Sequence, residues 1–123
     1  MNPYRLALEA AVDLARRGLP LDAAERINPA LDEAFKRGSK DQASLLARNA
    51  ALFCEQGKEL ERARGYYARF LEAFGSDAAI LFALSLLDSE MGDVQGSVNH
   101  RELARRVAAE RGDSDILDLL GDQ

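Results

Sequence analysis

The chain has 123 residues, of which 47% are hydrophobic and 30% charged, and its net charge is −5 at pH 7. The length fits one domain, and the composition is that of a globular rather than a disordered protein. The acidic balance argues against nucleic-acid binding, because a phosphate backbone repels it. The single cysteine, Cys54, excludes an intramolecular disulfide and a cysteine-based zinc site.

The sequence offers no segment that we interpret as a membrane anchor or signal peptide. Glu9 and Asp13 interrupt the apolar stretch at the N-terminus, which a signal peptide would not tolerate. The longest run without a charge, residues 78–87, is too short to cross a bilayer. We therefore expect a cytoplasmic protein with no membrane partner and no nucleic-acid partner.

Two helices are predicted in the first third of the chain. Asn2 is a suitable N-cap with proline next to it, and Gly18 provides the first stop. A second helix is expected from Pro20 to Arg37. Asn28-Pro29 lies inside this range, where proline removes a backbone hydrogen bond. The helix either kinks there or begins afresh with Asn28 as its cap, and the sequence leaves both possibilities open.

Glycines divide the remainder of the chain into further helices. Gly38, Gly57, Gly75, Gly92 and Gly112 follow Gly18 at intervals of 17 to 20 residues, which predicts helix stops. Suitable N-caps for later helices are Ser39, Ser76 and Asp93. No segment alternates apolar and polar residues as a strand would.

An internal repeat emerges when Gly18, Gly57 and Gly92 are aligned, with spacings of 39 and 35 residues. A small residue follows each glycine, and another precedes it by seven positions. The following residues are Ala23, Ala63 and Ser97, and the preceding ones are Ala11, Ala50 and Ser85. The interval from Gly57 to Ala63 is one residue longer than the corresponding interval from Gly18 to Ala23.

This pattern resembles the tetratricopeptide repeat (TPR), a helix-turn-helix unit of about 34 residues. The resemblance implies an all-α fold in which antiparallel helical pairs stack as a right-handed α-solenoid, with six main helices and a short C-terminal capping helix. We expect one TPR-like domain over residues 1–123, with repeats at approximately 3–37, 40–75 and 76–111 and a cap at 113–121.

The stretch GKELERARGYYARFLEAFGSD has a mechanical interpretation in such a fold. Gly57 turns the chain between two helices, and Ala63 is small because those helices cross closely. Tyr66 and Tyr67 point about 100° apart on a helix. One can therefore face the partner helix and the other the neighbouring repeat.

Residues with catalytic or ligand-binding chemistry are few. His100 is the only histidine, and Cys54 has no histidine near it in the sequence. Asp113, Asp115 and Asp118 lack the glycine and glutamate of a calcium-binding loop. We therefore expect no catalytic, cofactor or metal site, and a protein that is not an enzyme.

The resemblance also implies a groove, because the first helix of each TPR pair lines the concave face. The matching positions are Arg5, Leu8, Val12 and Arg16 in the first repeat, Ala47, Ala51, Cys54 and Glu55 in the second, and Phe82, Leu86, Ser89 and Glu90 in the third. Ala47, Ala51 and Phe82 stand where some family members carry Lys and Asn to hold a peptide carboxylate. The groove is therefore expected to accept an apolar or amphipathic peptide.

The leading functional hypothesis is a non-enzymatic protein–protein interaction module, a scaffold or adaptor. The alternatives are a small chaperone for a secreted protein and a regulatory subunit of an enzyme. The sequence does not identify the partner.

The tail GDSDILDLLGDQ is expected to cover the end of the last repeat. On the preceding helix, Val94, Val98, Ala104 and Ala108 form a stripe that should face its partner helix, which leaves Leu103 and Val107 on another side. A short helix over residues 114–120 would cover those two side chains. The competing hypothesis is that the tail docks on a second copy and makes a homodimer.

Overall fold

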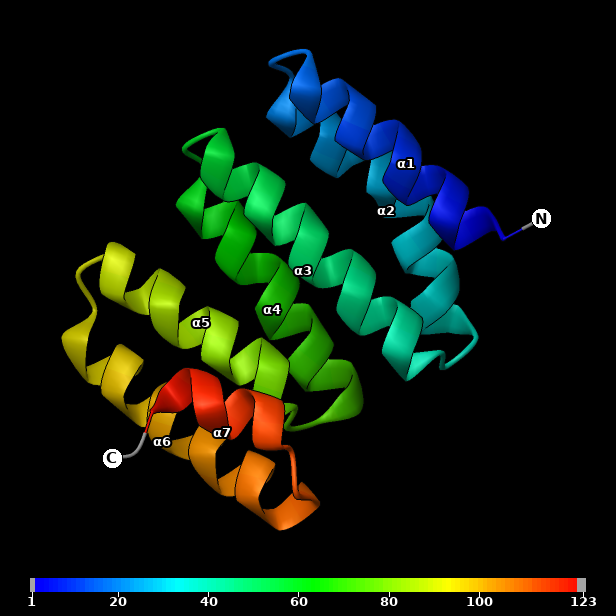
Figure 1. Ribbon diagram of the computed structural model, residues 1–123. Coiled ribbons are helices and arrows are strands. Elements are labelled where there is room, and N and C mark those ends of the chain that lie inside the picture. The colour runs from blue at the N-terminus through cyan, green and yellow to red at the C-terminus, as the bar shows by residue number, and fades with distance from the viewer. Residues whose placement is uncertain (1, 122–123) are drawn as a thin grey trace. The chain divides into compact units, whose positions relative to one another are not determined.

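The computed structural model describes residues 2–121, and all regular secondary structure in that range is helical (Figure 1). Six long helices and one short helix follow one another along these residues, as the sequence predicts. They are α1 (Pro3–Arg16), α2 (Pro20–Lys36), α3 (Lys40–Gln56), α4 (Leu60–Phe74), α5 (Ala78–Glu90), α6 (Val94–Arg111) and α7 (Ser114–Leu120).

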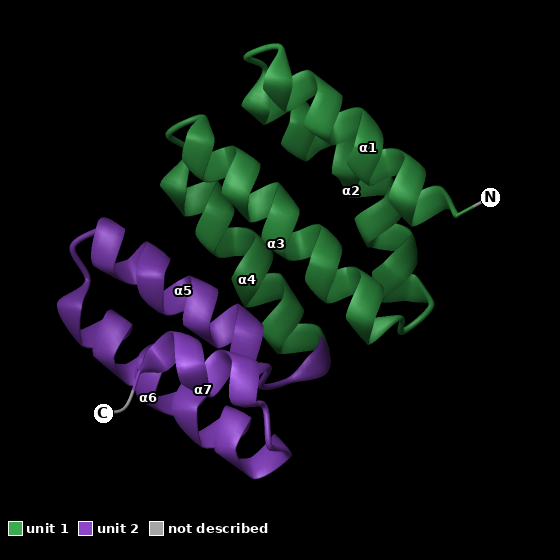
Figure 2. Cartoon of the chain, viewed as in Figure 1, with its two compact units in different colours: residues 1–73 green, residues 74–123 purple. Residues whose placement is uncertain are grey.

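The chain forms two compact units, residues 1–73 and residues 74–123 (Figure 2). In unit 1, α1 packs against α2 and α2 against α3, and α1 also contacts α3. Side chains of α4 reach α2 within the same unit. In unit 2, α5 packs against α6, and α7 contacts both of them. Each unit is therefore built from antiparallel helical hairpins joined by short turns.

Side chains cap the N-termini of several helices. Asn2 Oδ1 accepts hydrogen bonds from the backbone N–H of Tyr4 at 3.0 Å and of Arg5 at 3.3 Å, as its position before Pro3 predicts. Asp93 caps α6 in the same way. At the start of α5 the cap is Asp77 rather than the expected Ser76, because Asp77 accepts from the N–H of Ile80.

Pro29 does not divide the second helix. α2 is one helix from Pro20 to Lys36 with Pro29 inside it. Asn28 does not serve as a new N-cap, since its Oδ1 instead accepts a hydrogen bond of 2.6 Å from the hydroxyl of Tyr66 on α4. The alternative in which Asn28-Pro29 splits the helix is therefore wrong.

The turn of the second repeat differs from the expected one. Gly18 and Gly92 adopt positive φ values of 82° and 84°, but in the second repeat Lys58 has this conformation, with φ 65°. Gly57 is the C-cap of α3 and has φ −84°. Lys58 is therefore the structural equivalent of Gly18 and Gly92, and each of the three lies five positions before the following small residue.

Gly57 is small for another reason. A Cβ atom built on it would lie 2.6 Å from Cδ2 and 2.8 Å from Cγ of Leu21 on α2. Glycine therefore allows the turn after α3 to approach the first repeat closely.

The two tyrosines of α4 have different environments, and the predicted contact of one of them with the neighbouring repeat is confirmed for Tyr66. Tyr67 is buried in the core together with Ala63 and Phe70, and burial raises the pKa of its hydroxyl well above the ordinary value. Tyr66 is half-buried and reaches Asn28 in the neighbouring repeat.

Polar pairs accompany that contact along the line where α4 meets α2. Arg62 lies 3.0 Å from Glu25, and Arg69 lies 2.8 Å from Asp32. The guanidinium of Arg69 also lies 4.2 Å from the centre of the Phe35 ring. These pairs join two consecutive repeats inside unit 1 at its exposed surface.

The predicted C-terminal helix is present and packs within its own unit. Asp113 caps α7, and Ile116 and Leu120 are buried. Arg101 on α6 donates a hydrogen bond of 2.7 Å to the carbonyl oxygen of Leu120. The tail therefore covers part of its own chain, and Val107 of α6 is buried.

The stripe predicted on α6 is only half right. Ala104 and Ala108 are buried, but Val94 is 72% exposed and Val98 is also exposed. The first two turns of α6 thus turn these valines toward solvent instead of the partner helix.

Candidate functional site

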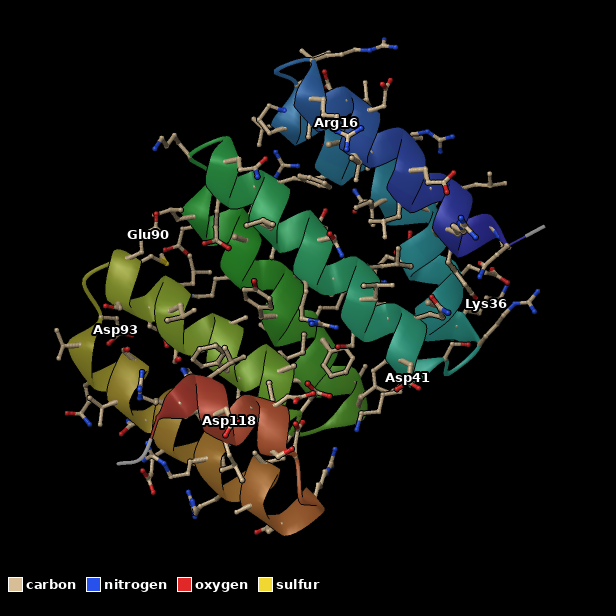
Figure 3. All side chains as sticks on the ribbon, viewed as in Figure 1. Arg16, Lys36, Asp41, Glu90, Asp93 and Asp118 are labelled. Atoms are coloured by element: carbon tan, nitrogen blue, oxygen red, sulfur yellow. The ribbon has the colours of Figure 1, made fainter. Side chains whose placement is uncertain are left out.

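The predicted groove residues of the first repeat gather on one face of α1. Arg5, Leu8, Val12 and Arg16 recur at intervals of three and four residues, and together with Glu9 they line a hollow of about 440 Å³. Arg5 Nε donates to Glu9 Oε1 at 2.9 Å on the exposed surface. Arg16 lies at the far end of the same face, near the C-terminus of α1 (Figure 3).

Three of the four groove residues predicted in the second repeat do not lie on an open face. Ala47, Ala51 and Cys54 are completely buried, and Glu55 is half-buried. The prediction failed because the repeat was aligned on Gly57, whereas Lys58 occupies the positive-φ position of the turn. A shift of one residue rotates a helical position by about 100°, which moves it from the surface into the core.

The corrected register assigns a different set of side chains to the open face of α3. Counting back from Lys58, the equivalents of Arg5, Leu8, Val12 and Arg16 are Leu45, Arg48, Leu52 and Gln56. Leu45 and Gln56 are exposed, Leu52 is 48% exposed, and Arg48 is half-buried. These residues were not predicted from the sequence, although the long interval between Gly57 and Ala63 is a signal of the shift.

The predicted positions on α5 are accessible. Leu86 is 53% exposed, Ser89 and Glu90 are exposed, and Phe82 is half-buried. Glu90 lies at the C-terminal end of α5 in unit 2 (Figure 3). The alignment of the third repeat on Gly92 is correct, because Gly92 adopts the positive φ expected of the turn residue.

The faces of the two units differ in charge. On unit 1, aliphatic side chains are accompanied by Arg5, Arg16 and Arg48, with Glu9 as the acidic member of the α1 hollow. On unit 2, Leu86 is accompanied by Glu90. The unit 1 face therefore combines aliphatic and basic side chains, in spite of the net negative charge of the chain.

A histidine–aspartate pair in unit 2 was not foreseen. His100 Nδ1 lies 2.6 Å from Oδ2 of Asp88, which is buried between α5 and α6, while His100 is partly exposed. The two residues stand twelve apart in the sequence and are joined by the α5–α6 turn. A buried carboxylate that orients an imidazole can support acid–base chemistry. The contact with His100 also gives the buried carboxylate of Asp88 a hydrogen-bond partner. Asp88 occupies the position that Leu14 and Cys54 hold in the other repeats.

Two other observations concern metal ligands and the single thiol. Within residues 2–121, no three His, Cys, Asp or Glu side chains come together as a metal site. Cys54 is buried, and burial raises the pKa of its thiol, which disfavours the reactive thiolate.

No helix in the part of the chain that the structure describes is long and apolar enough to cross a membrane. Comparisons with known protein families, curated proteins and solved structures found no match to the chain.

Proposed function

We propose that the chain is a TPR-type protein-interaction module without enzymatic activity, which binds a peptide or a helix of its partner on the open faces of its first helices. One observation carries the proposal. In every repeat, the residue six positions before the turn residue has an aliphatic side chain that remains accessible to solvent. These residues are Val12, Leu52 and Leu86.

Isolated exposed aliphatic residues are common on protein surfaces and need no functional explanation. A recurrence at one structural position is different, because it places an apolar side chain at the same point of successive hairpins. On α1 this side chain lies in a hollow that Leu8 also lines. An amphipathic helix or extended segment would cover such side chains with its own apolar face.

The chemistry of unit 1 narrows the bound segment to one with apolar and acidic residues. Arg5 and Arg16 flank Leu8 and Val12, and a carboxylate of the ligand would pair with either guanidinium at the rim. We expect these arginines to influence association rate and salt dependence, and the aliphatic residues to supply most of the affinity.

The test is affinity capture from the native host, with identification of bound proteins by mass spectrometry. The wild-type chain is compared with the double variant Leu52→Asp/Leu86→Asp and with the control Ala68→Asp, which changes an exposed residue of α4. Proteins retained by the wild type and the control but lost with the double variant are ligands of the proposed faces.

The identity of those ligands separates the alternatives. A single secreted protein would indicate a chaperone, several members of one complex a scaffold, and one enzyme a regulatory subunit. An identical set of proteins bound by all three versions would refute the proposed binding faces.

A further inference from the structure

The outer edge of the first repeat is open where the same edge of the second repeat is covered. Twelve residues before the turn residue, the second repeat has Leu46, which is fully buried, whereas the first has Leu6, which is 45% exposed. On the second helices, Arg62 and Arg69 of α4 contact α2. Their equivalents on α2, Asp22 and Pro29, are exposed.

A hollow of about 320 Å³ lies on this open edge between α1 and α2. Its apolar lining includes Pro3 and Leu6 from α1 and Pro29 and Ala30 from α2. Arg26 and Glu33 stand on either side of Pro29-Ala30 and line the same hollow. The edge thus has an apolar centre with opposite charges on its two sides.

The charge pattern along this edge of α2 is complementary to the same pattern read in the opposite direction. Asp22, Arg26, Pro29, Ala30, Glu33 and Arg37 fall within a stripe about 100° wide at 3.6 residues per turn. A two-fold axis at Pro29-Ala30 would place Arg26 opposite Glu33 of a second copy, and Asp22 opposite Arg37 of that copy. All four ion pairs across such an axis join opposite charges.

We propose that the chain forms a homodimer in which the α2 helices of two copies pack antiparallel across this edge, with Leu6 and Pro29-Ala30 in the apolar centre. A second copy is the occupant that the charge pattern specifies, because only a two-fold axis requires the pattern to match its own reverse. The contact leaves the Val12 and Leu52 faces outside the interface, so the dimer goes beyond the proposed binding function.

One ion pair within the chain must rearrange. Arg37 pairs with Glu33 one helical turn away, and the two side chains are 69% and 42% exposed. Exposed ion pairs contribute little to stability, so exchanging this partner for one in the second copy costs little.

Charge reversal tests both the interface and its geometry. Sedimentation equilibrium over a wide concentration range gives the dissociation constant of the wild type and of Arg26→Glu and Glu33→Arg. Each variant places like charges opposite one another twice, and we expect each to weaken self-association at least tenfold. Mixing the two variants restores opposite charges at both contacts and should produce a one-to-one heterodimer.

Three controls complete the experiment. Arg106→Glu reverses an exposed charge on α6 and should leave self-association unchanged. Leu6→Asp should abolish association through the apolar centre, and circular dichroism establishes that each variant retains the wild-type helix content.

Four results would each overturn the proposal. They are a wild type that stays monomeric at all concentrations, association insensitive to both reversals, a mixture that remains monomeric, and a dimer that persists in Leu6→Asp.

Discussion

The two units close their helical hairpins by different means. In unit 1, the hairpin of α1 and α2 is covered on one side by a second hairpin, and polar pairs such as Tyr66–Asn28 join the two. In unit 2, the hairpin of α5 and α6 is covered by α7, a helix of seven residues. A single hairpin leaves apolar surface on both sides, and a solenoid needs terminal capping elements for this reason.

α7 resembles the beginning of α5 in its cap and in its buried positions. Counted from the N-caps Asp77 and Asp113, the residues Ile80 and Leu84 of α5 correspond to Ile116 and Leu120 of α7, and all four are buried. Gly75 and Gly112, which precede the two caps, both adopt positive φ. α7 thus repeats the first two turns of α5, so a helix of seven residues is sufficient to cover the hairpin of unit 2.

The largest effect should come from removing this cover. Leu120 is fully buried and Leu119 is 62% exposed, so the two adjacent leucines form a matched pair. We expect Leu120→Ala to lower the free energy of unfolding by about 2–5 kcal/mol, through lost burial and a cavity, and Leu119→Ala to change it little. Urea denaturation measures both. Equal losses would contradict the assignment of α7 as a cover.

Deletion of residues 113–123 sharpens the comparison between the units, and it is made in the Leu6→Asp variant so that the α2 dimer does not mask association through the tail. We expect amides of α5 and α6 to exchange hydrogen faster after the deletion, and amides of α1 and α2 to change less. The truncated protein should also associate through its uncovered end. If the tail instead joins two copies, truncation should convert a dimer into a stable monomer. A truncated protein that is monomeric and as stable as the full chain contradicts both ideas.

The next effect concerns the hairpin of α3 and α4, which covers the first hairpin within unit 1. Ala63 is completely buried in α4, and Glu61 on the same helix is exposed. A leucine at position 63 must displace its neighbours, and overpacking of this kind costs about 1–3 kcal/mol. We expect Ala63→Leu to lower the melting temperature by several degrees and Glu61→Leu to leave it nearly unchanged. Similar melting temperatures for the two variants would show that no close crossing exists at Ala63.

Most of the fold could be predicted because its signals are local. Glycine spacing, the Asn2 cap and the small residues Ala11 and Ala23 all act within one or two turns of helix, and the observed elements agree with them. The exposure of Val94 could not be predicted this way. Its periodicity matches a buried stripe, but burial depends on which helices lie nearby, and periodicity does not report this.

The candidate site was predicted less well because it depends on register. The α1 and α5 positions are accessible, whereas the α3 positions Ala47, Ala51 and Cys54 are buried. Sequence rules assign positive φ to glycine, and here a lysine adopts it beside a glycine that is needed for a contact with Leu21. The pairing of His100 with Asp88 was missed because it requires the geometry of the α5–α6 turn.

Substitutions in the turn of the second repeat should change the free energy of unfolding by a smaller amount. The expected changes have opposite signs at the adjacent residues Gly57 and Lys58. We expect Gly57→Ala to destabilise the protein by about 1 kcal/mol, because the new Cβ meets Leu21. Lys58→Gly should stabilise it by up to about 1 kcal/mol, because a left-handed conformation strains a residue with a Cβ.

In unit 2, Gly92 adopts the left-handed conformation at the equivalent turn. A Cβ atom built on Gly92 would have no neighbouring atom within 4 Å. Gly92→Ala should therefore destabilise through strain alone, by about 1 kcal/mol. Chemical denaturation of the three variants measures these changes. A stabilising Gly57→Ala or a destabilising Lys58→Gly would reverse the roles assigned to the two residues.

The smallest effect on stability at neutral pH is expected from the ionisation of two buried side chains of unit 1, Tyr67 and Cys54. Burial raises the pKa of Tyr67 above its ordinary value of 10.0 and that of Cys54 above its ordinary value of 9.0. The folded chain therefore retains protons that the unfolded chain releases once the pH exceeds about 9–10. Stability should be independent of these two groups at pH 7 and should fall as the pH rises from about 9 to 11.

Tyr67→Phe tests the origin of that alkaline loss. Phenylalanine keeps the buried ring but has no proton to release in the unfolded state, so the variant should lose less stability between pH 9 and 11 than the wild type does. Urea denaturation at a series of pH values measures the difference, and tyrosinate absorbance of the folded protein reports whether Tyr67 keeps its proton. Parallel stability profiles for the two proteins would mean that Tyr67 ionises as readily in the folded chain as in the unfolded one, and the alkaline sensitivity would then have no source in the core of unit 1 at this position.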